Sequence, residues 1–298
     1  KGSSPCKSLV RASFGVAFKS MAGYGSAQVP ALPLDNLVGR SLKELLDEHR
    51  TAINSLRESL GTDPFEDDQI LLRYLLAEYG NLEEAEAKAR QGREARQKYA
   101  RVLDLARAHA QLPQEKIIRE SLCYGRWTGP SAAGTMPPMI VTRSGRSNAQ
   151  ALMENSSVEE VAEFLIWERA RVFQELHQMS QQSGQLVIMV SVNDLDGASI
   201  ITGREPKFFE AVKVSSEVGA VLFPLCTRKH VMVNSGFWIQ GLYKLASNFM
   251  PQRVLDKVAF MSCEELVASC GIPASSLPDF LGGQCPVPAD SPLASRVG

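Results

Sequence analysis

The chain has 298 residues, and 32 Lys plus Arg against 33 Asp plus Glu give it a net charge of −1 at pH 7. This balance argues against a nucleic-acid-binding protein, which would carry a basic surplus or a basic stripe. Hydrophobic residues make up 44% and charged residues 22%, a composition typical of a globular protein with an apolar core, which excludes wholesale disorder and a fibrous repeat. No uncharged apolar run reaches the roughly 18 residues that a membrane-spanning helix needs.

The first 34 residues contain basic side chains and no acidic one, and the first carboxylate is Asp35. This composition is typical of an organelle-targeting segment. It favours a peripheral location in an organelle, for example a plastid, over the cytoplasm. Apolar residues at helical spacing indicate a short amphipathic helix, lying on a membrane, on a partner or on the protein itself. Glycines and prolines over 22–39 predict a linker, so residues 1–40 form a basic extension and linker.

Residues 41–112 predict a helical module. Leucines recur at three- and four-residue steps after Ser41, and Gly61 ends that run. A second helix is predicted over 63–80, with acidic residues in its first turn, and charged helices continue to residue 112.

Residues 113–285 predict an α/β module, and 286–298 a Pro- and Ser-rich tail that we expect to be extended. β-branched and apolar runs that indicate strands cover 139–143, 186–193, 230–233 and 257–262. Amphipathic helical segments lie between the first three. Because strands separated by helices require crossover connections, we predict a mostly parallel sheet.

Motifs for catalysis or metal binding are missing from the sequence: we find no nucleophile elbow, phosphate-binding loop or zinc-protease motif. His49, His109, His177 and His230 are each expected to be surface or structural residues. The six cysteines form no CxxC pair and are expected to be reduced and mostly buried. Asp194 and Asp196 are expected to cap a turn rather than hold a metal. We therefore predict no enzyme, no catalytic residue, no metal and no required cofactor.

Residues 234–250 are unusual because they carry two adjacent apolar stripes and only a narrow polar strip. A surface helix needs one apolar stripe, facing the core. The second stripe predicts contact with something else, such as an apolar cavity or a membrane. A helix fully buried in a large core would show the same pattern.

Four segments in order along the chain resemble the CRAL-TRIO family, which includes phosphatidylinositol-, tocopherol- and retinaldehyde-binding transfer proteins. They are LLRYLLAEYGNLEEA, LVIMVSVNDLDGASI, HVMVNSGFWIQGLYKLASNFMPQRVLDKVAFMS and LPDFLGGQC, and the resemblance covers roughly residues 63–285. The resemblance implies a helical N-terminal module and a sheet that floors an apolar pocket, closed by a gate helix.

This resemblance also implies the ligand-binding residues. The floor strand would contribute Met189 and Ser191, and the basic Lys257 matches a residue that contacts phosphoinositide headgroups in some members. The gate helix would contribute Phe237, Trp238, Leu242, Leu245 and Phe249.

Departures from the family pattern bear on the ligand. Headgroup-binding members carry Arg-Lys where this chain has Glu78-Tyr79, and Pro-Glu where it has Pro224-Leu225. Glu78 would repel a phosphate. We therefore expect a less polar ligand than phosphatidylinositol, such as a tocopherol, carotenoid, quinone, other isoprenoid or fatty acyl lipid.

Two functions follow from these observations. The first is a lipid-binding transfer protein that works peripherally at a membrane. The alternative is a structural subunit, docked on a membrane or a membrane-protein complex through its terminal extensions. Deleting residues 1–34 would separate them, because only the docking function requires that segment.

Overall fold

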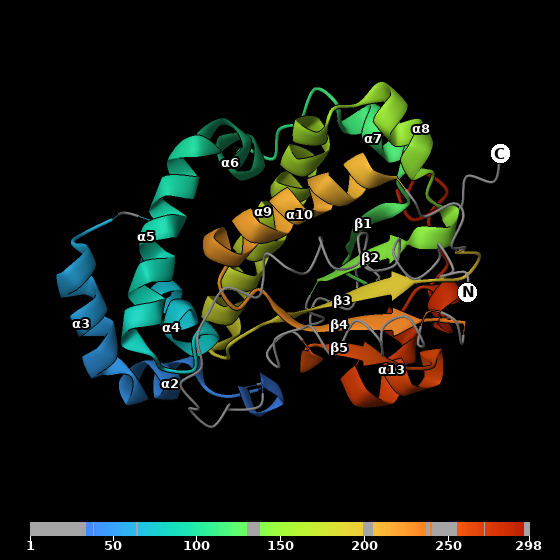
Figure 1. Ribbon diagram of the computed structural model, residues 1–298. Helices are drawn as coiled ribbons and strands as arrows, with labels where there is room; N and C mark the ends of the chain where they lie inside the picture. The colour runs from blue at the N-terminus through green and yellow to red at the C-terminus, as the bar shows by residue number, and fades with distance from the viewer. Residues whose placement is uncertain are drawn as a thin grey trace, which may run out of the picture.

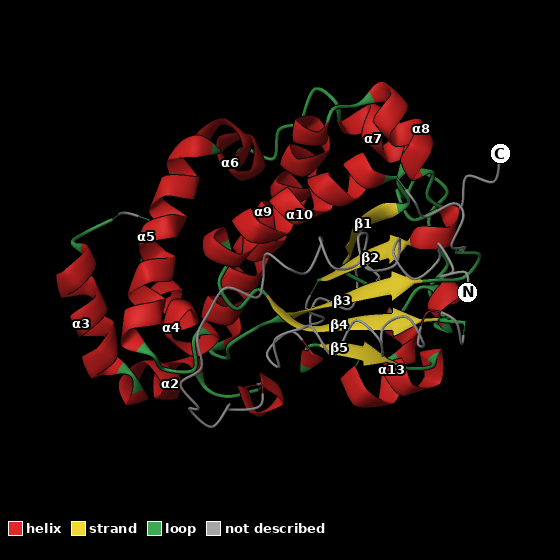
Figure 2. Ribbon diagram, in the orientation of Figure 1, coloured by secondary structure: helices red, strands yellow, loops and turns green. Residues whose placement is uncertain are grey.

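The computed structural model describes residues 34–37, 39–63, 65–129, 138–198, 205–236, 239, 255–270 and 272–294. In this part of the chain a helical N-terminal region is followed by a mixed α/β region with a five-stranded, mostly parallel sheet (Figures 1 and 2). The predicted α/β fold is confirmed.

The N-terminal region begins with a 3₁₀ turn, Leu34–Leu37, and continues with five α-helices. These are α2 (Leu42–Glu48), α3 (Arg50–Leu60), α4 (Asp68–Ala77), α5 (Leu82–Lys98) and α6 (Ala100–Arg107). Ser41, Asp67 and Asn81 cap α2, α4 and α5 by accepting a hydrogen bond from a backbone N–H in the first turn. The leucine-rich run that predicts one helix is interrupted at His49, which lies between α2 and α3.

The α/β region contains α7 (Glu115–Ser121), α8 (Ala149–Asn155), α9 (Val158–Ser183), α10 (Pro206–Leu222) and α13 (Cys263–Cys270). Its strands are β1 (Tyr124–Trp127), β2 (Met139–Arg143), β3 (Met189–Asp194), β4 (Thr227–Val233) and β5 (Val258–Phe260). Three short 3₁₀ turns complete it, at Ser144–Arg146, Ala274–Ser276 and Asp279–Leu281.

Strand order in the sheet is the order along the chain, β1-β2-β3-β4-β5. Strand β1 pairs with β2 antiparallel, and every later pair is parallel. Strand β1 is not indicated by the sequence, because its four residues include Gly125 and Arg126 and show no run of β-branched side chains.

Two apolar clusters lie on opposite faces of this sheet. The larger one includes Ile140 and Met189 and extends through α9 and α10 into the N-terminal helices. Because it crosses the boundary predicted at residues 112 and 113, the helical module and the α/β module share one continuous core.

Specific contacts join the two modules. Tyr74 Oη on α4 donates to the carbonyl of Val221 on α10 at 2.6 Å, and Trp167 Nε1 on α9 donates to the carbonyl of Ala110 at 3.1 Å. Gly92 of α5 packs directly against Tyr74, and a Cβ at this position would lie 2.3 Å from Tyr74 Oη. These bonds satisfy buried polar atoms and fix the helical module against α9 and α10.

The second cluster covers the other face and is closed by the C-terminal part of the chain. It contains valines from β2, β3 and β4 packed against Leu266 of α13 and against Leu277, Leu281 and Leu293. Leu293 is fully buried, and its carbonyl accepts from Arg143 Nη1 at 3.0 Å. The described part of the predicted extended tail therefore packs on the body of the protein.

Candidate functional site

The candidate site is the face of the sheet that points toward α9 and α10, which we call the first face. Side chains alternate along each strand, and residues paired in register share a face. Ser191 of β3 is paired with Ile140 of β2 and with His230 of β4, and His230 is paired with Val258 of β5. These four residues therefore form one row across the first face. A second row is formed by Tyr124, Thr142, Asn193, Met232 and Phe260.

The first face and the opposite face of the sheet, which we call the second face, differ in the burial of their side chains. On the second face, Val141, Val190, Val192, Val231 and Val233 are at most 5% exposed. On the first face, Ser191, Asn193, His230, Met232, Val258 and Phe260 are only half-buried. The valines of the second face are thus sealed, although Lys229 and Ala259 on that face are half-buried, whereas β3 to β5 carry half-buried polar and apolar side chains on the first face.

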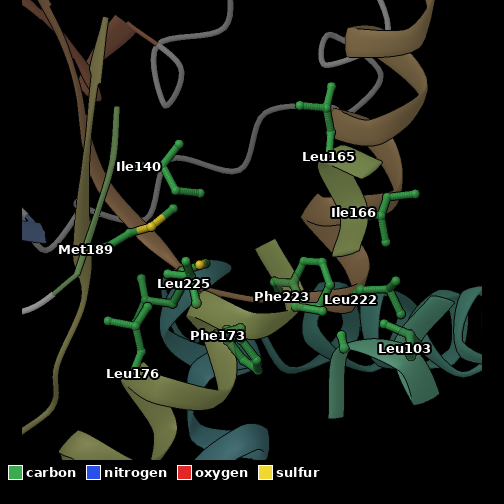
Figure 3. Packing of buried hydrophobic residues seen from close by; sticks show 14 of the residues in the cluster. Leu103, Ile140, Leu165, Ile166, Phe173, Leu176, Met189, Leu222, Phe223 and Leu225 are labelled. Carbon is green, nitrogen blue, oxygen red and sulfur yellow. The ribbon is translucent and has the colours of Figure 1, made fainter. Parts of the chain in front are cut away.

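Met189 and Ser191, predicted to lie on the floor strand, are both in β3 and point toward the first face. Met189 is 2% exposed and belongs to the large core cluster, whereas Ser191 is half-buried. Figure 3 shows Ile140 and Met189 projecting from the sheet, with Leu176 and Leu225 nearby. Met189 thus belongs to the packed core on this face, and Ser191 keeps accessible surface.

Lys257 lies directly before β5, and its carbonyl accepts from the backbone N–H of His230 at 2.6 Å. Its charge lowers the pKa of His230 and opposes the rise in the pKa of Cys226. Lys257, Ser191 and His230 are therefore brought together around β3, β4 and β5. The predicted gate residues Phe237, Trp238, Leu242, Leu245 and Phe249 lie outside the described residues.

His230, expected to be a surface or structural histidine, lies half-buried in β4 on the first face. It is paired in register with Ser191, and burial, Lys257 and Arg169 together lower its pKa to about 4. The alternation of HVMV could have indicated its face, but not its neighbours on β3 and β5.

The wall opposite the sheet carries charges. Glu168 of α9 is 2% exposed and pairs with Arg119, while Arg126 on the first face pairs with Glu175. Arg171 stacks over the ring of Trp167 at 4.6 Å from its centroid. Each of these arginines thus has a carboxylate partner.

The positions that bind headgroups in other family members have a packing role here. Leu225 is 4% exposed in the large core cluster, and its carbonyl accepts from Arg73 Nη1 at 3.1 Å. Glu78 is 8% exposed at the end of α4. The Arg73 contact joins the helical module to the α/β module, and the cation beside Leu225 is the buried guanidinium of Arg73.

Asp194 joins three strand ends on the second face. It accepts from Asn234 Nδ2 at 2.8 Å and from the backbone N–H of Asp196 at 3.0 Å, and it pairs with Arg143 at 3.4 Å. The expectation that an aspartate caps this turn is confirmed. Within the described ranges, no group of three or more His, Cys, Asp or Glu side chains could hold a metal ion.

Two hollows open on the surface away from the first row. One, of about 500 Å³, lies between α2, α3 and α4 and is lined partly by the ion-paired Arg57 and Asp68. The other, of about 480 Å³, lies where β4 and β5 end, beside Asn234 and Cys263. Neither contains convergent unpaired groups, so we do not assign either as the functional site. No helix in the described part is long and apolar enough to cross a membrane.

Comparison with known proteins agrees with this arrangement. The profile of the CRAL/TRIO domain matches residues 135–283, which is half of the chain. The crystal structure of Sfh5 superposes with a TM-score of 0.51 at 13% identity, covering 76% of this chain and 82% of Sfh5, and at this identity it supports the fold alone. None of the curated protein sequences matches this chain.

Proposed function

Because the chain belongs to the CRAL/TRIO family, whose members bind lipids and other small hydrophobic molecules, we propose that it holds such a ligand against the first face and presents it at a membrane. The unequal burial of the two faces carries this proposal. Ser191, His230, Met232, Val258 and Phe260 keep accessible surface, whereas the valines of β2, β3 and β4 on the second face are buried.

The energetics favour such a site. Burying an acyl chain contributes about 0.8 kcal/mol per methylene, so a sixteen-carbon chain represents on the order of 12 kcal/mol. An open groove would leave part of this surface in water. A ligand of this kind therefore needs a cover over the first face, and that cover must open for exchange.

The topology supports a role for the predicted gate residues. Strands β4 and β5 are adjacent and parallel, so the segment between Val233 and Val258 must cross over. The other two crossovers between neighbouring parallel strands carry α9 and α10, which pack on the first face. Trp238, Leu242 and Phe249 fall within this segment, and we propose that they contact the ligand.

The first experiment is mass spectrometry of lipids that co-purify with the protein. We expect a hydrophobic molecule near one equivalent in the wild type and its loss in Ser191→Phe, because the larger ring fills the row between Ile140 and His230. Gln178→Phe, on an exposed position of α9, is the control and should retain the ligand. Wild-type protein that carries no ligand, and takes none up from vesicles, would refute the proposal.

Transfer is tested by the movement of a fluorescent fatty acyl lipid between donor and acceptor vesicles. The double variant Trp238→Ala with Leu242→Ala should bind and transfer less lipid than the wild type, because the cover would lose apolar contact area. Unchanged lipid stoichiometry in that variant would show that the gate has been placed wrongly.

The docking alternative depends on terminal extensions that are free to bind a partner. The C-terminal extension gives it little support, since Leu293 is buried and Cys123 Sγ contacts the Leu293 carbonyl at 3.5 Å. The N-terminal 33 residues lie outside the described ranges. Deleting residues 1–34 should leave ligand binding unchanged if the first face is the functional site.

We also propose that the acid-free N-terminal segment directs the protein to an organelle, with a plastid as the first candidate. Residues 1–40 fused to a fluorescent protein should then accumulate in that organelle. Diffuse fluorescence throughout the cytoplasm would contradict this proposal.

A further inference from the structure

Four polar side chains lie next to one another on the first face. Ser191 of β3 is paired in register with His230 of β4, and Asn193 of β3 is paired with Thr142 of β2. Ser191 and Asn193 are two residues apart on one strand, so the two pairs point to the same side of the sheet. We call these four residues the polar quartet. Each of them is half-buried, so its side chain keeps accessible surface.

The side chains of the polar quartet have no hydrogen-bond partner among the described residues. Asp194, at the end of the same strand, differs in this respect because it accepts from Asn234 Nδ2 at 2.8 Å. A polar group that loses its water without gaining a new partner costs free energy. A ligand that covers the quartet therefore has to supply hydrogen bonds, which a pure hydrocarbon cannot do.

The polar quartet carries no charge at neutral pH. Serine, threonine and asparagine side chains are neutral, and burial, Lys257 and Arg169 lower the pKa of His230 to about 4. A hydroxyl group both donates and accepts, an amide offers both kinds of atom, and a neutral imidazole has one donor and one acceptor. The quartet can therefore hold either a hydroxyl or a carbonyl group.

Two arginines that could offer a charge to a ligand are engaged by protein groups. Arg126, on the first face of β1, pairs with Glu175 of α9. Arg169 packs against α10, where its Nη1 donates to the Ser215 carbonyl at 3.3 Å and a Cβ on Gly219 would lie 2.0 Å from that nitrogen. Neither side chain therefore marks the quartet as a site for an anion.

Accessible apolar side chains border the quartet toward β5. Met232 of β4 is paired with Asn193 and with Phe260 of β5, and Val258 of β5 is paired with His230. Met232, Val258 and Phe260 are half-buried, as the quartet is. With strands about 4.8 Å apart, β2 and β5 are separated by about 14 Å. Over this distance the accessible surface changes from polar at β2 and β3 to apolar at β5.

We propose that the polar quartet binds the uncharged polar end of the hydrophobic ligand, a hydroxyl or a carbonyl group, while the apolar part of the ligand lies over β5. This inference rests on the proposed function and narrows it to a ligand class and an orientation. The family resemblance implies a contact only for Ser191. Thr142, Asn193 and His230 are additional residues that determine specificity.

The test measures how four radiolabelled sixteen-carbon probes distribute between the protein and phosphatidylcholine vesicles at pH 7.5. The probes are hexadecan-1-ol, hexadecan-2-one, hexadecane and hexadecanoic acid. For each protein the affinity for a polar probe is divided by the affinity for hexadecane. Because partition into the vesicles is the same for every variant, a change in this ratio reports only the hydrogen bonds that the protein makes.

Asn193→Leu keeps the approximate size of the side chain and removes its hydrogen bonds, so it should lower the alcohol-to-alkane ratio by about tenfold. Thr142→Val should lower this ratio by about threefold. Affinity for hexadecane should be unchanged or higher in both variants, which distinguishes a lost hydrogen bond from a damaged site. Asn54→Leu makes the same change at an exposed position of α3 and should keep the wild-type ratio.

The ketone separates the two kinds of polar end. A larger loss of the alcohol ratio in Asn193→Leu assigns a hydroxyl group, and a larger loss of the ketone ratio assigns a carbonyl group; either result supports the inference. Unchanged ratios in both Asn193→Leu and Thr142→Val would overturn it, as would a loss of hexadecane affinity equal to that of the alcohol.

Hexadecanoic acid tests the absence of charge. If Asn193→Leu lowers the acid-to-alkane ratio more than the alcohol-to-alkane ratio, the site binds an anion and the inference is wrong, while the proposed function remains intact. Binding of none of the four probes to the wild type would instead refute the proposed function itself.

Discussion

The two faces of the five-stranded sheet are built from the same strands but differ in what covers them. On the second face, valines of β2, β3 and β4 pack against α13 and the C-terminal segment, and the layer is sealed. On the first face, β3 to β5 alternate polar and apolar side chains that stay half-buried. The valines of the second face are tightly packed, whereas the first face lacks packing contacts that a bound molecule could supply. Substitutions on the two faces should therefore have different consequences.

The largest effect is expected at Asp194, which supports the sealed face. Asp194→Ala would leave the buried Arg143 without its carboxylate and Asn234 without an acceptor. Removing one partner of a buried ion pair costs about 3–5 kcal/mol, measured here by urea denaturation. Asp196→Ala, in the same turn but exposed, should cost less than about 0.5 kcal/mol. Similar losses in the two variants would contradict the role given to Asp194.

The C-terminal tail contributes Leu293 to the core of the second face. Leu293→Ala should lower the free energy of unfolding by about 3 kcal/mol, since this fully buried side chain closes the sealed face. Val287→Ala, at a partly buried position of the same segment, should cost less than about 1 kcal/mol. A Leu293→Ala protein as stable as the wild type would mean that the tail is not part of the core.

Neighbouring residues on β3 give the most direct comparison of the faces. Val192→Ala should cost about 2 kcal/mol through lost burial and an internal cavity, with ligand binding preserved. Ser191→Ala should change the free energy of unfolding by less than about 0.5 kcal/mol. Thermal unfolding together with lipid titration checks both. Equal destabilisation by the two changes would show that the first face is packed as tightly as the second.

The smallest effect is a pH dependence from His230. Its pKa is about 4 in the folded protein and 6.5 in the unfolded chain, so between these values the unfolded state binds more protons. The free energy of unfolding is therefore highest above pH 6.5 and decreases as the pH falls toward 4. Since His230 keeps accessible surface, we expect the free energy of unfolding to fall by about 1–2 kcal/mol over this range, which is less than the full pKa difference implies.

Lys257 and Arg169 are the other charged groups that act on His230. His230→Gln should therefore flatten this part of the stability profile, measured by urea denaturation at pH 7, 6 and 5. Parallel profiles for the wild type and the variant would exclude a desolvated histidine on the first face.

Sequence patterns predict the elements well where one residue type dominates a segment. Strand β2 was predicted with its observed bounds, and helices were predicted between the strands where α9 and α10 lie, because the apolar spacing of these segments is unambiguous. Strand β1 was missed because YGRW is held in place by its pairing with β2 rather than by local preference. The C-terminal tail was expected to be extended because it is rich in proline and serine. This composition does not reveal that Leu293 is buried against the body of the protein.

What the sequence alone determined is the family, the α/β architecture and the presence of Met189 and Ser191 on a floor strand, because motif order and local periodicity are written along the chain. Only the tertiary structure decided that His230 lies beside Ser191, that Gly219 gives room to Arg169, and that one face of the sheet is sealed while the other is partly accessible. These properties depend on the register between strands and on contacts between helices distant in sequence. No local pattern encodes such contacts, because burial and charge pairing arise only when the elements pack together.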